Sequence, residues 1–362
     1  MDIALIGLAA SGKTTLLHAL AAGHLPGGHT SPTETAMAVV KVPDERLDRL
    51  AAAVSARKTT YLELRLMDFP GFSVGRKGPP PQLLGTLSTA DLLVHVVRSF
   101  SEESIPHPLE SIDPDRDIAA LELELIFADL AVVERRTERI QVEARSLAAG
   151  ARGPLDRELA LQRRLKEALE AEKPVRSLGL TAEEKTLLSG FNLLTGKPLL
   201  NVLNIDEADA PRTAEIEAAA REKHAGPDAD VIAIAAKAEA DVAELPADEA
   251  AEFRRELGLP EQAAAERLLQ ETVSLLGLIT FYTVGPQDTH AWSVSAGTPA
   301  VKAAGRIHSD IERGFIRAEV IDSADFLEAG SHAEAKRRGN QRLEGKTYEV
   351  REGDVINVLF NV

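Results

Sequence analysis

The sequence contains no cysteine, and aromatic residues make up 4% of the chain. Without cysteine the protein forms no disulfide and uses no thiolate nucleophile, and a zinc site would have only histidine and carboxylate ligands. Neither an HExxH motif nor a close pair of histidines is present, so we expect no structural zinc. Because apolar residues reach 44% while aromatic rings are few, we expect an aliphatic core.

Long apolar runs and an excess of positive charge are also lacking. No apolar segment approaches the ~20 residues that a membrane-spanning helix needs, and Met1 leads directly into a strand-like segment without a signal peptide. We therefore expect a cytoplasmic protein that does not enter a membrane. The net charge of −16 argues against a free-standing binder of duplex DNA but leaves a local basic patch open. The length of 362 residues suggests two or three domains.

Residues 7–14 read GLAASGKT, which matches the phosphate-binding pattern GxxxxGK[ST] between a strand (residues 3–6) and a helix. The two glycines, Gly7 and Gly12, let the backbone turn so that successive N–H groups point at phosphate oxygens. Lys13 would place a positive charge on the β- and γ-phosphates, and the Thr14 hydroxyl would bind Mg²⁺. The predicted phosphate-binding residues are Gly7, Ala10, Ser11, Gly12, Lys13, Thr14 and Thr15.

A second motif, Asp68-Phe-Pro-Gly71, follows the strand-like residues 61–67. In GTPase-type sites such an aspartate holds Mg²⁺ through water, and the glycine N–H contacts the γ-phosphate. Phe72 comes next, where many GTPases carry a glutamine that orients the attacking water. Hydrolysis, if it occurs, then needs another group or a water held by the backbone.

Between these motifs, residues 24–36 are the expected first switch segment. Thr33 and Thr35 are both candidates for closing on Mg²⁺ and the γ-phosphate, and the sequence does not choose between them. Further strands are expected at residues 92–97, 199–204 and 231–235. His95 lies inside the first of these strands, and we expect it to be packed rather than catalytic.

The segment NIDE, residues 204–207, ends a strand where a GTP-binding protein would read Asn-Lys-x-Asp. In that motif the aspartate accepts two hydrogen bonds from guanine, and the lysine stem covers the base. Glu207 is one methylene longer and Ile205 offers only an apolar face, so adenine is no longer penalised. We expect ATP binding with weaker GTP binding, and the Asn204 amide together with nearby backbone groups reading adenine N6. Ala235-Ala-Lys237 resembles the loop that holds the purine from behind.

Residues 117–195 have helical periodicity with a break at residues 150–154, which predicts an antiparallel helical hairpin inserted into the nucleotide-binding domain. The C-terminal region reads as a small α+β unit with strands at 279–284, 292–294, 316–320 and 355–360, and a helix at 298–312. Lys336, Arg337, Arg338, Arg342 and Lys346 form the densest basic cluster in the chain. Trp292 and Tyr348 can stack on bases, although a single tryptophan is more often part of a core.

These features together resemble the YchF/Obg-like ATPases over nearly the whole chain. The resemblance rests on the order of the motifs, on N-x-x-E at residues 204–207, and on the longer strings KVPDERLDRLAAAV, LTAEEK, LLGLITFYTVG, AWSV, IHSDIERGFIRAEVI and RLEGKTYEVREGDVINVLFNV. It implies an α/β P-loop NTPase domain of GTPase type (residues 1–116 and 196–273), an inserted helical coiled-coil arm (117–195) and a C-terminal α+β TGS domain, similar to a β-grasp (274–362).

The family is associated with ribosomes and ATP hydrolysis, and it also has a hydrophobic residue in place of the catalytic glutamine. A histidine after the 92–97 strand is implicated in its hydrolysis, and the matching position here is His107. A solvated loop histidine is an equally good interpretation of that residue. The chain departs from the family at Ala10, where an asparagine can coordinate a monovalent cation, and at Pro79-Pro80-Pro81, which stiffens the second switch segment.

The sequence therefore predicts a slow, Mg²⁺-dependent ATPase with His107, Gly71 and Lys13 in catalytic roles. The base-binding residues would be Asn204, Ile205, Glu207 and Ala235, and the Mg²⁺ ligands would come from Thr14, Asp68 and either Thr33 or Thr35. A ribosome or RNA would be contacted through the arm and the TGS domain. Two alternatives stay open, a nucleotide-gated binding module that does not hydrolyse ATP and a GTPase of the Obg class.

Overall fold

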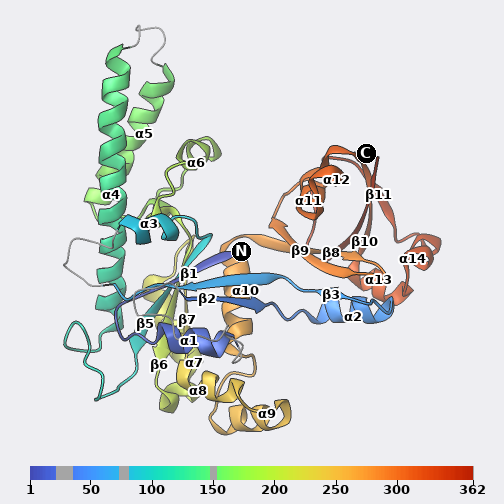
Figure 1. Ribbon diagram of the computed structural model, residues 1–362, viewed down its shortest axis with the longest axis horizontal. Coiled ribbons are helices and arrows are strands. Elements are labelled where there is room, and N and C mark those ends of the chain that lie inside the picture. Colours follow the sequence, from blue (N-terminus) through green and yellow to red (C-terminus); the bar gives the residue numbers. More distant parts are fainter. Residues whose placement is uncertain (22–35, 73–80, 147–152, 362) are drawn as a thin grey trace. The chain divides into compact units, whose positions relative to one another are not determined.

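The computed structural model describes residues 1–21, 36–72, 81–146 and 153–361 (Figure 1). The chain forms two compact units, and each is described by itself. The first comprises Met1–Val39 and Arg65–Glu271, and the second comprises Val40–Leu64 and Thr272–Val362. In the described residues, no helix is both long enough and apolar enough to cross a bilayer.

The first unit is built on a sheet with the strand order β2-β4-β1-β5-β6-β7. β1 pairs in parallel with β4 and β5, β5 with β6, and β6 with β7. The strands span Asp2–Ile6 (β1), Ala36–Lys41 (β2), Glu63–Asp68 (β4), Leu92–Ser99 (β5), Leu199–Ile205 (β6) and Ala229–Ile234 (β7). Runs such as IALI and LLVHVV are apolar throughout, as expected for strands covered on both faces. The parallel pairing brings the carboxyl ends of β1, β4, β5 and β6 to one edge, where ligands bind in α/β sheets.

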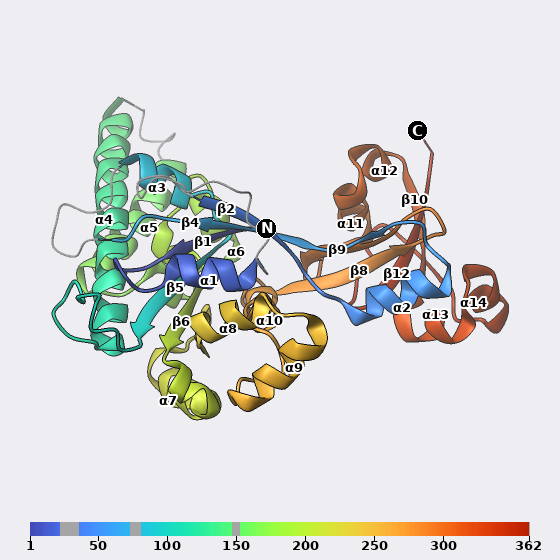
Figure 2. The same ribbon diagram turned by 60° about the horizontal axis from the view of Figure 1, so that its bottom comes forward.

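Helices cover this sheet. They are α1 (Lys13–Leu20), α3 (Pro81–Leu87), α7 (Thr213–His224), α8 (Ala236–Ala243), α9 (Ala247–Glu256) and α10 (Ala264–Leu275). α1 packs beside α8, which brings the start of the phosphate loop helix close to the helix that follows β7 (Figure 2). Leu16, Leu17 and Leu20 of α1 are buried against the sheet, as the spacing of the leucines predicts.

The predicted helical hairpin is confirmed. α4 (Pro114–Ser146) and α5 (Gly153–Glu170) lie side by side (Figure 1). Arg136 pairs with Glu158, and Lys166 pairs with Glu134, so residue numbers rise on one helix as they fall on the other. Their shared core is aliphatic, with Ile126, Val133, Leu161, Leu165 and Leu169 buried in it. The predicted break lies mostly outside the described residues.

The last third of the predicted arm is not part of the helical hairpin. Residues 171–196 form short elements, namely η2 (Val175–Leu178), α6 (Ala182–Leu188) and η3 (Leu194–Gly196). α6 begins with a capping box in which the Thr181 side chain accepts from Glu184 N and the Glu184 side chain accepts from Thr181 N. These elements return the chain from α5 to β6.

The second unit contains a sheet of order β11-β10-β12-β8-β9-β3. Its elements are β3 (Thr59–Thr60), β8 (Leu278–Val284), β9 (Thr289–Ser295), β10 (Phe315–Asp322), β11 (Arg342–Glu344), β12 (Asp354–Phe360), α2 (Glu45–Ala53), α11 (Ala300–Ile307), α12 (Ser309–Arg313), α13 (Ser323–Ala329) and α14 (His332–Arg338). β8 and β12 pair in parallel at the centre, and β8 pairs antiparallel with β9, as in a β-grasp fold. The predicted α+β architecture is confirmed.

Two details of this unit differ from the sequence-based expectation. The single helix predicted at 298–312 is two helices, because His308 is extended (φ −165°) and its side chain caps α12. Residues 40–64, which the sequence placed with the nucleotide-binding domain, belong to the second unit. The reason is packing, since Leu47 and Leu50 of α2 are buried with Tyr282 and Phe326.

Candidate functional site

The phosphate loop between β1 and α1 has the backbone that its glycines predict. Gly7 has φ +151° and Gly12 has φ +86°. Residues with a side chain rarely adopt positive φ angles of this kind. A Cβ on Gly12 would lie 2.1 Å from Asn204 Nδ2, and one on Gly7 would lie 2.4 Å from the Val96 carbonyl oxygen. Both positions therefore require glycine for space as well as for conformation.

Lys13 lies at the first residue of α1 with 7% of its surface exposed. Its Nζ donates to the carbonyl oxygens of Leu8 at 2.8 Å and Gly7 at 3.2 Å, so the ammonium folds back over the loop. Burial lowers the pKa of Lys13 to about 8, and the negative charge of Asp68 opposes this shift. The group is therefore a cation at neutral pH that is poorly hydrated and ready to exchange carbonyl partners for phosphate oxygens.

This lowered pKa predicts that phosphate binding weakens above pH 8. The protonated form of Lys13 attracts phosphate, and above a pKa of about 8 the free protein must first take up a proton. The phosphate ionisation near pH 6 is complete in this range, so it does not compensate. We expect the affinity for a triphosphate to fall by up to ~10-fold per pH unit between pH 8 and 10. Calorimetric titration measures it, and Lys13→Arg should flatten the profile because arginine stays charged.

Thr14 and Asp68 meet beside Lys13. The Thr14 hydroxyl donates to Asp68 Oδ2 at 2.7 Å, and Asp68 ends β4 with 8% of its surface exposed. Among the described residues, the other carboxylate oxygen, Oδ1, has no hydrogen-bond partner although it is buried. Burial raises the pKa of Asp68, while Thr14 and Lys13 act in the opposite direction. A buried carboxylate oxygen without a partner is an acceptor held ready for a donor or a cation.

The residues after Asp68 are fixed to the phosphate loop. Phe72 N donates to the Gly7 carbonyl at 2.9 Å, and a Cβ on Gly71 would lie 2.7 Å from Ala9 Cα. The Phe72 side chain is 5% exposed and packs in the core with Leu8 and Phe69. It thus points into the protein interior, which agrees with the expectation that this residue orients no water. Residues 73–80, including Pro79 and Pro80, lie outside the described residues.

The base motif at the end of β6 is positioned by Asn204, which is 5% exposed. Its Nδ2 donates to the Ser11 carbonyl at 3.1 Å, and its Oδ1 accepts from Ala236 N at 3.2 Å. The side chain therefore links the phosphate loop to the start of α8. Each polar atom of the amide thus has one protein partner, which leaves one N–H and one lone pair for a base, so the reading of adenine N6 by Asn204 stays a prediction.

A cavity of about 970 Å³ opens where these strand ends meet. Each of four strands supplies part of its wall: residues 9–15 after β1, 68–71 after β4, Phe100–Ser101–Glu102 and Ile105 after β5, and 204–208 after β6. Lys237, from the Ala-Ala-Lys loop, completes the lining. Of the residues predicted to bind the ligand, the lining includes Ala10, Ser11, Gly12, Lys13, Thr14, Thr15, Asp68, Gly71, Asn204, Ile205 and Glu207.

Of the predicted residues that the structure describes, Gly7, Ala235 and His107 do not line the cavity. Gly7, at the start of the loop, lies against the Val96 carbonyl of β5, and Ala235 is buried in the core beside β7. Thr33 and Thr35 lie outside the described residues. Sequence reasoning missed the wall after β5, although the rule that parallel strands end at one edge would have pointed to residues 100–105.

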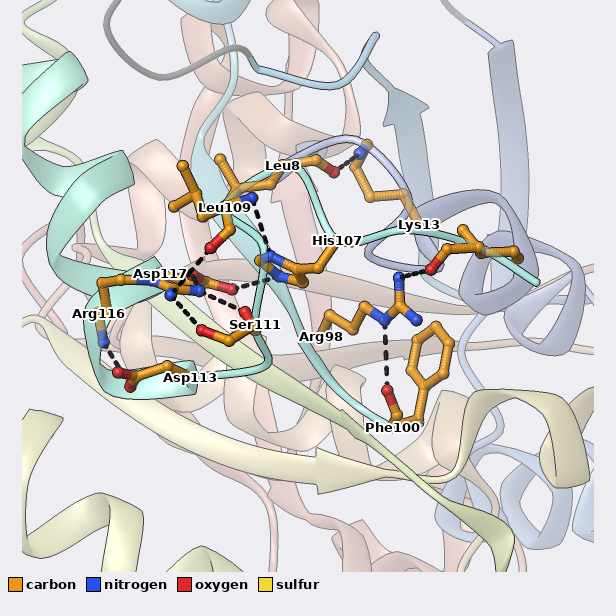
Figure 3. A network of polar contacts seen from close by, with 11 residues as sticks. Leu8, Lys13, Arg98, Phe100, His107, Leu109, Ser111, Asp113, Arg116 and Asp117 are labelled. Atoms are coloured by element: carbon orange, nitrogen blue, oxygen red, sulfur yellow. Dashed lines mark hydrogen bonds and ion pairs between the residues drawn. The ribbon is translucent and has the colours of Figure 1, made fainter. Parts of the chain in front are cut away.

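His107 is the third predicted residue that does not line the cavity, and Figure 3 shows it turned toward Asp117. Its Nδ1 accepts from Leu109 N at 3.1 Å, so Nε2 carries the proton and donates to Asp117 Oδ2 at 2.8 Å. The side chain is 4% exposed, which makes the solvated-loop interpretation wrong. Asp117 is itself buried and also accepts from Arg116, so the root of α4 holds this histidine away from the cavity.

Other candidates are explained by packing. His95 is buried, its Nδ1 lies 3.0 Å from Asn201 Oδ1, and burial lowers its pKa to about 3, as expected of a packed histidine. Trp292 donates to Thr283 Oγ1 and stacks on His290, and the Tyr348 hydroxyl donates to Asp354. Both aromatic rings proposed for base stacking therefore already have protein partners. Within the basic cluster, Arg337 and Arg338 pair with Glu334, and Arg342 contacts Asp354.

A phosphate loop with its lysine, a strand-end aspartate beside the Thr14 hydroxyl, and a base motif at the next strand define a P-loop nucleotide-binding protein of GTPase type. Comparison with known proteins identifies the family within this class. A family model named YchF-GTPase_C, described as "Protein of unknown function (DUF933)", matches residues 278–361. "Ribosome-binding ATPase YchF" of Bacillus subtilis (strain 168) is 40% identical over 365 residues, covering 99% of this chain and 98% of the relative.

The protein of the same name from Escherichia coli O157:H7 is 35% identical over 363 residues, again covering 99% of this chain and 98% of the relative. The solved structure of the Schizosaccharomyces pombe YchF GTPase matches with a TM-score of 0.83 at 25% identity, covering 99% of this chain and 97% of that chain. The chain belongs to the YchF family. The resemblance inferred from its motifs is confirmed.

Proposed function

We propose that this chain binds ATP, hydrolyses it slowly and uses the nucleotide state to control binding to ribosomes. The observation that carries this proposal is the cavity that joins the phosphate loop to a base motif ending in Glu207. The names of the bacterial relatives, ribosome-binding ATPases, support both the activity and the partner. A ribosomal partner also supports a cytoplasmic location.

The phosphate end of the cavity fits a nucleotide bound with Mg²⁺. Thr14 Oγ1 and the unpartnered Asp68 Oδ1 are hard oxygen donors beside Lys13, as this ion prefers. Bound Mg²⁺ would neutralise charge that develops on the phosphates. Lys13 and the loop amides would hold the phosphate oxygens, and Gly71 N–H would contact the γ-phosphate. Thr33 or Thr35 would complete the metal site.

The base end of the cavity favours adenine by not selecting guanine. Ile205 is 3% exposed and presents no polar group, and Glu207 carries its carboxylate one methylene farther out than the aspartate of a guanine-reading site. The adenine edge would be read by the remaining N–H and lone pair of the Asn204 amide and by nearby backbone groups. GTP would bind more weakly, because the Glu207 carboxylate extends one methylene beyond the place from which an aspartate accepts from guanine N1–H and its amino group.

Shortening Glu207 should shift this preference. In Glu207→Asp the carboxylate moves to the length that a guanine-reading motif uses, so we expect the ratio of GTP affinity to ATP affinity to rise at least ~10-fold. The measurement is calorimetric titration of both nucleotides, with magnesium, on the variant and on the original protein.

Glu207→Gln is the matched control, because it keeps the length and removes the charge. It should leave the ratio within about twofold of the original protein, since glutamine offers one acceptor where guanine needs two. Preference for GTP already in the original protein would contradict the proposal and favour a GTPase of the Obg class, and the fission yeast relative is itself named a GTPase.

A second candidate function is a nucleotide-gated binding module without turnover. It is favoured by the placement of two residues, since Phe72 is buried in the core and the His107 side chain is bound to Asp117 outside the cavity. For His107 to position water, it would have to leave Asp117. ATP-dependent cosedimentation with ribosomes, together with phosphate release no faster than background, would select this second candidate.

The arm and the C-terminal unit are the proposed contact surfaces for a ribosome or RNA. α4 and α5 carry exposed arginines, among them Arg139 and Arg163, whereas the half-buried Arg136 and Lys166 are paired with glutamates. In the C-terminal cluster, Lys336 and Lys346 add exposed ammonium groups to the paired arginines. These surfaces would contribute salt-dependent contacts with phosphate.

A further inference from the structure

The wall of the cavity after β5 is made by residues 100–105, which form neither helix nor strand. Phe100, Ser101, Glu102 and Ile105 line the cavity, and residues 101–106 are otherwise exposed to solvent. A short exposed segment of this kind does not hold one conformation by itself, because ordering each residue costs backbone entropy. Something outside the segment must keep it in place.

Arg98, at the carboxyl end of β5, supplies this support (Figure 3). The residue is 3% exposed, and its guanidinium donates to three carbonyl oxygens of the segment. The bonds are Nε to Phe100 O at 3.2 Å, Nη1 to Ile105 O at 3.0 Å and Nη2 to Glu102 O at 3.1 Å. A planar guanidinium can serve three acceptors at fixed angles, which a lysine cannot do.

The segment is also fixed on its other sides. The guanidinium carbon of Arg98 lies 4.7 Å from the centroid of the Phe100 ring, and this ring reaches the phosphate loop, with Cε1 3.6 Å from the position of a Cβ on Gly12. Ser101 N donates to Asp206 Oδ2 at 2.9 Å. Asp206 is the third residue of the segment NIDE, which follows β6. This hydrogen bond therefore joins the segment after β5 to the base motif after β6.

We propose that Arg98 is a positioning residue for the purine, which holds residues 100–105 as a preformed wall of the base end of the cavity. The inference rests on the proposed function, because it concerns where the base of the nucleotide binds. A wall that is already in place saves the cost of ordering it when the ligand enters. Arg98 does not line the cavity, so it acts through Phe100 and Ile105.

The test separates the base from the phosphates by titrating two ligands, a non-hydrolysable ATP analogue and inorganic tripolyphosphate. Arg98→Met and Arg98→Lys should each lose roughly tenfold in affinity for the analogue, the size of one lost stacking surface. Affinity for tripolyphosphate should stay within about twofold, because the phosphate loop is unchanged. Equal losses in the two variants would show that geometry matters rather than charge.

Arg116→Met is the matched control. Arg116 also holds carbonyl oxygens of the same connection, those of Leu109 and Ser111, but neither residue lines the cavity. Its affinity for both ligands should match that of the original protein. Asp206→Ala removes the second support without touching Arg98, so it should show the same selective loss even if the Arg98 variants fold poorly.

The outcomes distinguish the two levels of the proposal. If the original protein binds tripolyphosphate and the analogue, and the Arg98 and Asp206 variants lose both ligands equally or neither, the role of Arg98 is refuted while the nucleotide site stands. If the original protein binds neither ligand, the proposed function fails and this inference fails with it. A selective loss of the analogue, absent from Arg116→Met, supports the assignment.

Discussion

Replacing Lys13 by alanine is expected to reduce phosphate release from ATP to the background rate and to weaken ATP binding by ~100-fold or more. Removing one partner of a buried, charge-assisted contact costs roughly 3–5 kcal/mol, because the phosphates lose a cation in a site with little water. In the free protein Lys13 is 7% exposed, and within the described part of the chain its ammonium donates to two carbonyl oxygens of the loop. Removing the side chain should therefore weaken phosphate binding strongly and change the folding stability little.

The measurement is release of inorganic phosphate under saturating ATP, together with calorimetric affinity for the non-hydrolysable analogue. Lys13→Arg is the control, since it keeps the positive charge at this position and should retain part of the binding. A thermal melting point close to that of the original protein would show that Lys13→Ala is folded. Equal rates of phosphate release by the original protein and Lys13→Ala would mean that the activity belongs to another site or to a contaminant.

The phosphate end of the site was predictable because its signals are local. Gly7, Gly12 and Lys13 lie within one turn of chain, and the apolar run before them and the leucine spacing after them identify the strand and the helix. Asp68 and Glu207 were found from signals of the same local kind, the short motifs D-x-x-G and N-x-x-E, each at the end of a predicted strand. The hairpin was predictable for a similar reason, since its helical period extends over tens of residues.

The base end was predicted less well because its contacts join distant parts of the chain. Asn204 bonds to Ser11, 193 positions away, and to Ala236, 32 positions away, and neither contact leaves a pattern in the sequence. An asparagine at this place can equally read a base or link two loops. The wall at residues 100–105 depends on Arg98. The bonds from its guanidinium go to backbone carbonyl oxygens, which every residue has, so the sequence does not show them.

Tertiary packing also decided the unit to which residues 40–64 belong. The sequence order places them between two nucleotide-binding motifs, which favoured the first domain. Their amphipathic helix buries Leu47 and Leu50 against the C-terminal core, and Thr59 and Thr60 pair with β9. Amphipathic spacing shows that a helix has an apolar face, but it does not show which core covers that face.

Replacing Asp129 by alanine is expected to destabilise the first unit by about 4 kcal/mol. Asp129 lies in α4 with 1% of its surface exposed, and it accepts three hydrogen bonds from the turn before β6. Leu194 N donates to Oδ1 at 2.8 Å, and Thr195 N and Thr195 Oγ1 donate to Oδ2 at 2.7 Å and 2.6 Å. Alanine would leave these donors buried without an acceptor, and each such group costs ~1–3 kcal/mol.

The measurement is urea unfolding followed by circular dichroism, which reports on all helices of the chain, with a large share from the long α4 and α5. Asp129→Asn should fall between the alanine variant and the original protein, because one carbonyl acceptor remains while the new amide faces a donor. Glu138→Ala, an exposed carboxylate of the same helix, should change the stability by less than ~0.5 kcal/mol. The chain has one tryptophan, Trp292, and it lies in the other unit, so its fluorescence follows that unit separately. If Asp129→Ala lowered the free energy of unfolding no more than Glu138→Ala does, apolar contacts alone would hold the root of the arm. The buried carboxylate would then contribute little to joining α4 to the nucleotide-binding sheet.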